Sequence, residues 1–478
     1  MHRFVSRMGL LLSLSAAVTL TGCSEVGGGD MGATPGGVKD MTFARTLVEA
    51  GRVPPASALL VEAMFAEHDL PLSGAPCTEA LCLKSAIGRA PTLEGEAHAW
   101  AQIGLSSGVD SDTFVRPATS FIATVDVSGS MGWGGQGSPG EIARKLLSQI
   151  TGKLGGNDRV SIVTYGSSVD LELDWVPGND PGIPTVIAGL SENGSTNMEA
   201  GLERAFQLGE AEAAKGRETR VLLFTDEQPN VGATDPGSFE DLVRDAASHR
   251  VGLTVFGLGL GLGAELMQDM AHLRGGNAFS LAEDADVDPF IAENWPWFTV
   301  PVAYDLEVHS KPTSGVSVIA GYGFPGGADG PAQSLEVASV FLSKSRGGLL
   351  LELGGEFKPD SGVDFDLTYL GPNDQAHAVT VSTRIGSAPL DARGVSMPEL
   401  GVSRATSLAI FVSAMHEAAA LYATQPGAAA ALLDGALERL HADADASKDA
   451  DLSAEFTFWT KLAALMHQGA PQGDLYGE

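Results

Sequence analysis

The 478-residue sequence is short of basic residues and of apolar runs long enough to span a bilayer. It has 29 Lys and Arg against 60 Asp and Glu, a formal net charge of −31 at pH 7. A surface of that charge repels nucleic acid and anionic lipid, which argues against both as partners. The apolar run at residues 8–20 is shorter than the roughly 20 residues that a transmembrane helix needs. Because 44 % of the residues are hydrophobic, the acidity does not indicate disorder.

The first 22 residues have the form of an export signal. Basic residues precede the short apolar run, as they do in signal peptides. The run ends in Leu20-Thr21-Gly22-Cys23, which resembles a bacterial lipobox. Cleavage before Cys23 would leave that residue lipidated at the mature N-terminus, and several acyl chains make a stable membrane anchor. The alternative is an ordinary cleaved signal that happens to contain a cysteine.

Residues 23–40 are expected to be the lipidated cysteine and a flexible tether. The segment after Cys23 is rich in glycine and shows no apolar periodicity, which predicts a reach of about 20–25 Å. Ser24, directly after the cysteine, resembles the outer-membrane sorting pattern of two-membrane bacteria. We therefore expect a cell-envelope protein that is lipid-anchored to the outer membrane.

With Cys23 assigned to the anchor, two cysteines remain, Cys77 and Cys82. In an oxidising envelope an even remainder suggests a disulfide. A spacing of five does not place two side chains on one helical face, so a bridge requires a loop here. The alternative is a pair of buried thiols.

The middle of the chain alternates strands and helices. Strands are expected at residues 121–127, 159–165, 169–175, 219–225, 252–259 and 278–282, and helices at 138–154, 197–214, 238–250, 264–274 and 287–298. Residues 121–125 and 221–224 are apolar on both faces, which is typical of parallel strands covered by helices on both sides. This order predicts a doubly wound, mostly parallel α/β fold, whose ligands bind beyond the carboxyl ends of the strands.

The flanking regions differ in character. Two short helices are expected within residues 42–68 and a strand at 97–105, and period-two alternation after Pro301 predicts an antiparallel β module. Helical periodicity returns from Ser403 to the end. The expected division is a signal peptide at 1–22, a tether at 23–40, an N-terminal module at 41–118, an α/β domain at 119–299, a β-rich module at 300–400 and a helical region at 401–478. We also expect the α/β domain to be inserted in a β module, with strands on either side of it pairing.

Oxygen-bearing side chains follow two strands at the predicted switch point. The segment DVSGS at 126–130 ends one strand, TDEQPN at 225–230 ends another, and GSTN at 194–197 opens a helix between them. Carboxylates and hydroxyls without histidine or cysteine are hard ligands suited to Mg²⁺, Mn²⁺ or Ca²⁺. Two carboxylates and three hydroxyls leave an open coordination position, where a partner's carboxylate can enter.

These three segments, in this order, resemble the metal-ion-dependent adhesion site of von Willebrand factor type A domains. The resemblance covers roughly residues 119–298. It implies that Ser128 and Ser130 bind the metal directly, and that Asp126, Thr196 and Asp226 bind it directly or through water. The outer regions resemble, with less specific motifs, bacterial envelope proteins in which such a domain sits between an N-terminal module and a C-terminal extension.

The sequence departs from the family pattern at two places beside the metal motifs. Glu227 stands where the family usually has glycine, and a Gly-rich insert carries Trp133. Both residues are candidate partner contacts, since an exposed aromatic is a common anchor in interfaces. The alternatives are a solvent-facing carboxylate and a simple connector.

The leading function is therefore a binding module: an anchored envelope protein that engages a protein ligand through a divalent metal, without catalysis. One alternative is a structural envelope protein with a non-functional metal site. The other is a metal-assisted hydrolase that uses Asp126 or Asp226 as a base, which the lack of a nearby histidine disfavours.

Overall fold

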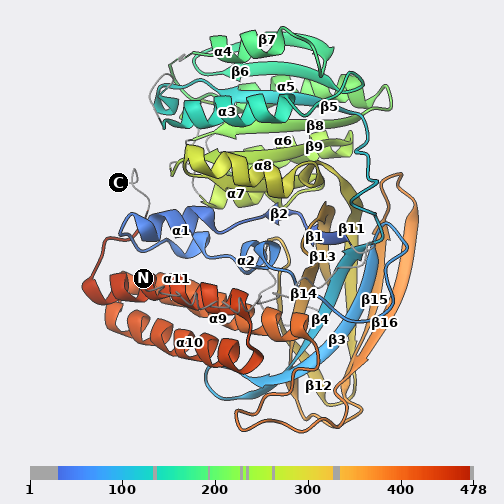
Figure 1. The fold of residues 1–478 in the computed structure, drawn as a ribbon, viewed down its shortest axis with the longest axis vertical. Coiled ribbons are helices and arrows are strands. Elements are labelled where there is room, and N and C mark those ends of the chain that lie inside the picture. The colour runs from blue at the N-terminus through green and yellow to red at the C-terminus, as the bar shows by residue number, and fades with distance from the viewer. Residues whose placement is uncertain are drawn as a thin grey trace, which may run out of the picture.

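Two β-sheets and a bundle of helices make up the computed structural model of the chain (Figure 1). It describes residues 31–132, 137–191, 194–226, 230–232, 236–260, 264–326 and 334–473. A parallel sheet with its helices lies at the top of Figure 1, with an antiparallel sheet and the C-terminal helices below it. The expected α/β fold with a flanking antiparallel module and C-terminal helices is confirmed.

The upper sheet has seven strands in the order β2-β10-β9-β8-β5-β6-β7. Their bounds are β2 Gly37–Val38, β5 Thr119–Asp126, β6 Arg159–Tyr165, β7 Val169–Pro177, β8 Glu218–Thr225, β9 Val251–Leu258 and β10 Gly276–Leu281. All neighbours pair in parallel except β6 with β7. Every residue of β5 is buried, as its run of apolar side chains predicts for a central parallel strand.

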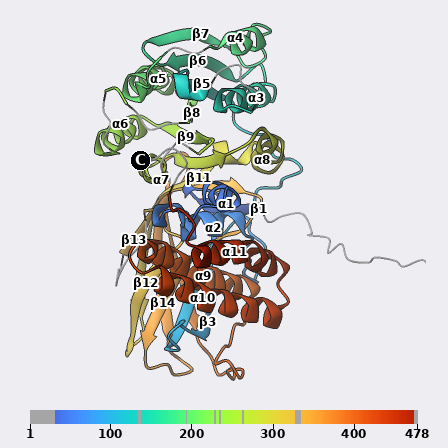
Figure 2. The same ribbon diagram turned by 90° about the vertical axis from the view of Figure 1, so that its left-hand side faces the viewer.

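Helices cover both faces of this sheet (Figure 2). They are α3 Pro139–Thr151, α4 Ile183–Gly189, α5 Met198–Ala213, α6 Pro236–Ser248, α7 Ala264–Ala271 and α8 Val287–Asn294. Figure 2 shows α5 and α6 on one side and α3 and α8 on the other. The side chains of β8 divide between them, because Val221 packs with the α5 core and Leu222 with the α3 core.

The lower sheet has nine antiparallel strands, in the order β12-β14-β4-β1-β13-β11-β15-β16 with β3 beside β4. Their bounds are β1 Met31–Pro35, β3 Cys82–Pro91, β4 Ala97–Ser107, β11 Pro301–Pro312, β12 Val316–Tyr322, β13 Ser334–Ser343, β14 Gly347–Gly355, β15 Gly362–Leu370 and β16 Ala376–Arg384. Strand β4 pairs with β14, and β1 pairs with β13. Strands from before and after the α/β domain thus share one sheet, which confirms the predicted insertion. We call this sheet the β module.

The expected extent of the tether is wrong. The tether predicted over residues 23–40 does not extend beyond residue 30, because 31–38 form the buried strands β1 and β2. Glycine serves close packing here: a Cβ on Gly32 would lie 1.8 Å from the carbonyl oxygen of Ser345. The regions 41–118 and 300–400 both contribute strands to the β module, as the predicted insertion requires.

Three long helices close the chain: α9 Leu400–Tyr422, α10 Pro426–Ser447 and α11 Ala450–Gln468. They pack with the N-terminal helices α1 Thr42–Glu49 and α2 Val61–Glu67 in one hydrophobic core. None of the helices in the described part of the chain combines the length and apolar character needed to cross a bilayer.

Candidate functional site

The site lies at the carboxyl ends of β5 and β8, which are neighbours in the upper sheet. Asp126 is the last residue of β5 and Asp226 directly follows β8. Both carboxylates are almost entirely buried, with exposed fractions of 0 % for Asp126 and 6 % for Asp226. The structure thus brings together the two acidic residues that the sequence predicts as metal ligands.

A chain of oxygens joins the two strand ends. The Ser128 amide donates to Asp126 Oδ1 at 2.8 Å, and the hydroxyl oxygens of Ser128 and Ser130 lie 3.0 Å apart. The Ser130 hydroxyl donates to Asp226 Oδ1, also at 3.0 Å. Adjacent ligands in an octahedron with metal–oxygen bonds of 2.0–2.1 Å are about 3.0 Å apart. Ser128, Ser130 and Asp226 therefore already have the spacing that neighbouring Mg²⁺ ligands require.

Asp126 is held in place from both sides of its carboxylate. Its Oδ2 accepts a hydrogen bond of 3.0 Å from the Thr225 hydroxyl. Burial raises the pKa of Asp126, and the hydrogen bonds from Ser128 and Thr225 oppose that rise. Among the described residues, no lysine or arginine forms an ion pair with Asp126. A buried carboxylate without a cationic side chain fits a site whose positive charge is supplied by a metal ion.

The third predicted segment is tied to the other two by backbone and side-chain bonds. Thr196 is fully buried, and its amide donates to Asn230 Oδ1 at 3.0 Å. Asn230 Nδ2 in turn donates to the Thr196 hydroxyl at 3.4 Å, and the Gly129 amide donates to the Gly194 carbonyl at 2.8 Å. The three loops are thus fixed to one another, with the Thr196 hydroxyl held on the side of the Asp226 loop.

Two positioning residues were not assigned a role from the sequence. Thr225 orients Asp126, and Asn230 orients Thr196. Both belong to the segment 225–230 that carries the family resemblance, so the signal was present. Hydrophobic periodicity and motif spacing alone do not show which side chains would bind the ion and which would hydrogen-bond to the residues that bind it.

The remaining candidate residues fall into two groups. Trp133, Glu227 and Cys23 lie outside the described residues. Cys77 and Cys82 form a disulfide with an S–S distance of 2.10 Å at the start of β3. This bridge belongs to the β module and not to the loops around Asp126.

Comparison with known proteins identifies this part of the chain. Residues 121–228 match the sequence model of the von Willebrand factor type A domain. The chain contains a von Willebrand factor type A domain. We refer to the upper sheet and its helices as the A domain.

Two relatives show how far the similarity extends. The uncharacterized protein YfbK of Escherichia coli K12 is 28 % identical over 221 residues, which is 45 % of this chain and 38 % of that protein. Human inter-alpha-trypsin inhibitor heavy chain H4 is 27 % identical over 179 residues, 35 % of this chain and 18 % of that protein. The chain therefore spans less than two fifths of the length of either relative.

A solved structure is similar over a larger part of the chain. The von Willebrand factor type A protein from Catenulispora acidiphila superposes with a TM-score of 0.52 at 13 % identity. The match covers 80 % of this chain and 91 % of that one. At this identity the match shows a shared fold, and its coverage extends well beyond the A domain.

Proposed function

We propose that the protein is a lipid-anchored cell-envelope protein that binds a protein ligand through a divalent metal ion in the A domain. The observation that carries this proposal is the set of hard oxygens on three interlocked loops, in which the Ser130 hydroxyl lies 3.0 Å from both the Ser128 hydroxyl and Asp226 Oδ1. Asp126 supplies a second buried negative charge. Mg²⁺ is the favoured ion, because it prefers oxygen ligands at short distances, and Mn²⁺ or Ca²⁺ are the alternatives.

Ser128, Ser130 and Asp226 would hold the ion, and Asp126 and Thr196 would hold it directly or through water. A bound ion would supply a positive charge, which would attract an acidic side chain to its open coordination position. The chain's own hydrogen bonds hold the Asp126 and Asp226 carboxylates and the Ser130 hydroxyl in place. A carboxylate of the protein ligand would complete the metal shell, with Trp133 and Glu227 as contacts beside it.

The chemistry of the site favours binding over hydrolysis. Residues 119–248 contain no histidine and no cysteine. A histidine base and a thiol nucleophile are therefore missing from the loops at 126–130, 194–197 and 225–230, which we call the metal loops, and from their neighbours in sequence. Tyr165, which is fully buried beside Asp126, has its pKa raised well above the usual value by burial and by the Asp126 charge. It therefore remains a neutral phenol at physiological pH.

The anchor and the location rest on the sequence of residues 1–24. A Cys23→Ala variant should remain unprocessed and lose the acyl mass at its N-terminus. Wild-type protein should fractionate with outer membranes and leave them when the acyl chains are removed. An unmodified mature N-terminus in the wild type would overturn this part of the proposal.

Partner capture from envelope extracts tests the metal-dependent function. Wild-type protein should retain the same partners in Mg²⁺ and lose them in EDTA, and Asp126→Ala should lose them in both. Asp174→Ala, at an exposed position on the edge strand β7, is the matched control and should behave as the wild type. Capture that is equal in Mg²⁺ and EDTA would support the structural role instead.

A further inference from the structure

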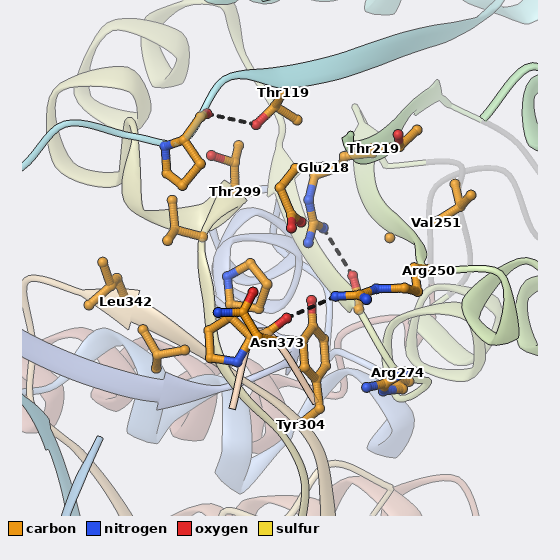
Figure 3. A pocket seen from close by; sticks show the side chains of 18 of the residues that line it. Thr119, Glu218, Thr219, Arg250, Val251, Arg274, Thr299, Tyr304, Leu342 and Asn373 are labelled. Atoms are coloured by element: carbon orange, nitrogen blue, oxygen red, sulfur yellow. Dashed lines mark hydrogen bonds between the residues drawn. The ribbon is translucent and has the colours of Figure 1, made fainter. Parts of the chain in front are cut away.

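A pocket of about 380 Å³ lies between the A domain and the β module (Figure 3). Its upper wall includes Thr119, Glu218 and Val251, which lie at the amino ends of β5, β8 and β9. The metal loops lie at the carboxyl ends of the same sheet. The pocket is therefore a separate site at the opposite end of the A domain, in the size range of small-molecule sites.

The lining of the pocket is divided into a basic side and an apolar side. Figure 3 shows Arg250 and Arg274 on one side with Tyr304 between them and the centre, and Leu342 on the other. The apolar side consists of Val109, Phe114, Val300, Val302 and Leu342. In a chain with a net charge of −31, three arginines around one cavity are a local reversal of charge.

Arg220 is the most buried of the three arginines, with an exposed fraction of 3 %. Its Nη1 donates to the Leu253 carbonyl, the Thr254 hydroxyl and the Gly275 carbonyl at 2.9–3.2 Å, all of which are neutral. Within the described residues, Nη2 and Nε make no hydrogen bond and no carboxylate lies within ion-pair distance. The guanidinium also lies over the Phe341 ring, 5.1 Å from its centroid, and the Glu218 charge acts on it from beyond ion-pair distance. A buried cation with no anion in direct contact is costly, so this guanidinium is prepared for an anionic ligand.

The other two arginines are already occupied. Arg250 and Arg274 both form ion pairs with Asp374, at 3.2 and 2.9 Å. Arg250 also donates to the Pro372 carbonyl at 2.9 Å, across the two modules. These bonds hold the turn between β15 and β16 against the A domain, so the two arginines form the wall of the pocket. Among the described lining residues, Arg220 is the arginine that has no ion pair.

Tyr304 offers a second donor. Its hydroxyl has no hydrogen-bond partner among the described residues, and burial raises its pKa to about 12 against the lowering effect of the Arg220 charge. The phenol therefore keeps its proton at neutral pH and can donate to an anion. Glu218 is the one acidic residue that lines the described pocket, and its side chain is exposed.

We propose that this pocket binds a small organic carboxylate with an apolar body, whose carboxylate accepts hydrogen bonds from Arg220 and Tyr304. The apolar body would lie against Val302 and Leu342. An inorganic anion would leave the apolar wall uncovered, and a neutral apolar molecule would leave the Arg220 charge without a partner. The bound ligand would touch both modules at once.

Calorimetric titration of the full chain with octanoate tests this proposal. We expect saturable binding of octanoate, binding of octanamide at least ten-fold weaker, and no binding of inorganic phosphate. Arg220→Gln should weaken octanoate binding at least ten-fold. Tyr304→Phe, which removes only the hydroxyl, should weaken it several-fold and keeps the test decisive if Arg220→Gln fails to fold.

Arg244→Gln is the matched control, because Arg244 is an exposed residue of α6 that pairs with Glu240 and does not line the pocket. It should bind octanoate as the wild type does. Val109→Trp, which places a large side chain in the pocket without touching the charge, should abolish binding. Equal binding of octanoate and octanamide, phosphate binding as tight as octanoate, or no saturable binding at all would overturn the proposal.

Discussion

At the scale of single residues, the proposed metal site predicts that Asp126 is needed for a response to metal. Its buried carboxylate lies on the oxygen cluster without a lysine or arginine partner among the described residues. We predict that Mg²⁺ raises the melting temperature of the wild type. At a Mg²⁺ concentration of one hundred times Kd, binding should stabilise the folded chain by about 2.7 kcal/mol. Asp126→Ala should remain folded and show no such rise, whereas Asp174→Ala should show all of it. Scanning calorimetry in Mg²⁺ and in EDTA measures both.

Lys39 makes stability depend on pH. Burial lowers the pKa of its amine to about 7, against a smaller raising effect of the Glu62 carboxylate. An unfolded lysine keeps its proton to about pH 10.4, so between pH 7 and 10 the unfolded chain binds more protons than the folded one. The free energy of unfolding should therefore rise with pH in this window, by at most about 1.4 kcal/mol per unit from this residue.

Lys39→Met should remove that contribution to the slope. Urea unfolding at pH 7, 8 and 9 measures it as the difference between wild type and variant, which should shift in favour of the wild type as pH rises. Lys153→Met, at an exposed position after α3, is the control and should leave the slope unchanged. A difference between Lys39→Met and wild type that is constant with pH contradicts the prediction.

For the proposed metal site, the sequence predicts which residues come together better than it predicts the hydrogen bonds between them. Asp126, Ser128, Ser130, Thr196 and Asp226 converge as the order of strands requires. The roles of Thr225 and Asn230 depend on which loop each side chain faces. The pocket around Arg220 could not be predicted from the sequence either, because its lining residues lie up to 264 positions apart in the chain, from Val109 to Asn373.

At the scale of elements, the start of α3 follows from its sequence. Ser138 is the N-cap, its hydroxyl accepts from the Glu141 amide at 3.3 Å, and Pro139 occupies the first turn. We predict that Ser138→Ala lowers the free energy of unfolding by about 0.5–2 kcal/mol, since the Glu141 amide loses its side-chain acceptor and keeps only the Ser138 carbonyl at 3.0 Å. Chemical denaturation measures the loss, and Ser148→Ala at an exposed position inside the same helix should change it less.

Strands β1 and β2, which the sequence did not predict, form because other strands pair with them. Strand β2 has two residues, and it is a strand because β10 offers it a parallel edge. Strand β1 is short and contains a glycine and a proline, but it fills the place between β4 and β13. Long periodic helices and apolar central strands need no such partner to be recognised, and for them the sequence was sufficient.

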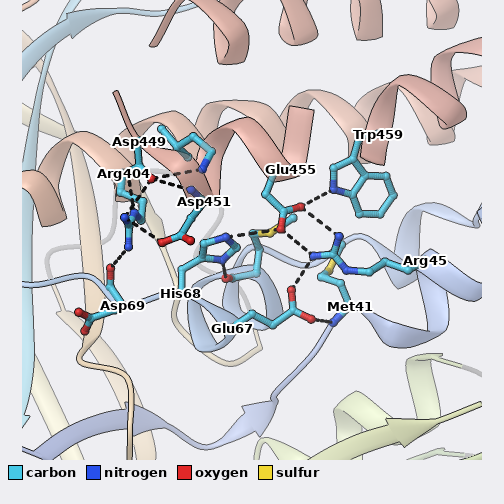
Figure 4. A network of polar contacts seen from close by, with 12 residues as sticks. Met41, Arg45, Glu67, His68, Asp69, Arg404, Asp449, Asp451, Glu455 and Trp459 are labelled. Carbon is cyan, nitrogen blue, oxygen red and sulfur yellow. Dashed lines mark hydrogen bonds and ion pairs between the residues drawn. The ribbon is translucent and has the colours of Figure 1, made fainter. Parts of the chain in front are cut away.

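At the scale of the whole molecule, the two ends of the described chain are joined by a buried polar cluster (Figure 4). Arg45 of α1 bonds to Glu455 of α11 at 3.0 and 3.1 Å and to Glu67 at 2.7 Å. Trp459 Nε1 donates to Glu455 Oε2 at 2.7 Å. The carboxylate of Glu455 therefore holds the C-terminal bundle to the first helix through several charge-assisted bonds.

Neutralising Glu455 should loosen that contact. We predict that Glu455→Gln lowers the free energy of unfolding by about 1.5–3 kcal/mol, the range for hydrogen bonds to charged groups. Lys461→Gln is the matched control: it removes an exposed pair with Glu49 between the same two helices, and its loss should be below about 1 kcal/mol. Equal effects of the two substitutions would show that the cluster contributes no more than a surface ion pair.

The course of residues 31–38 has a mechanical consequence. Within eight residues the chain passes from β1, which pairs on both sides with strands of the β module, to β2 on the edge of the A-domain sheet. A pull on residue 31 along the strand axis would load the hydrogen bonds of β1 in shear, so that they resist together and do not open one after another. Tension that enters from the N-terminal side would be borne first by the β module, and the metal loops at the far end of the A domain would keep their geometry until β1 slides.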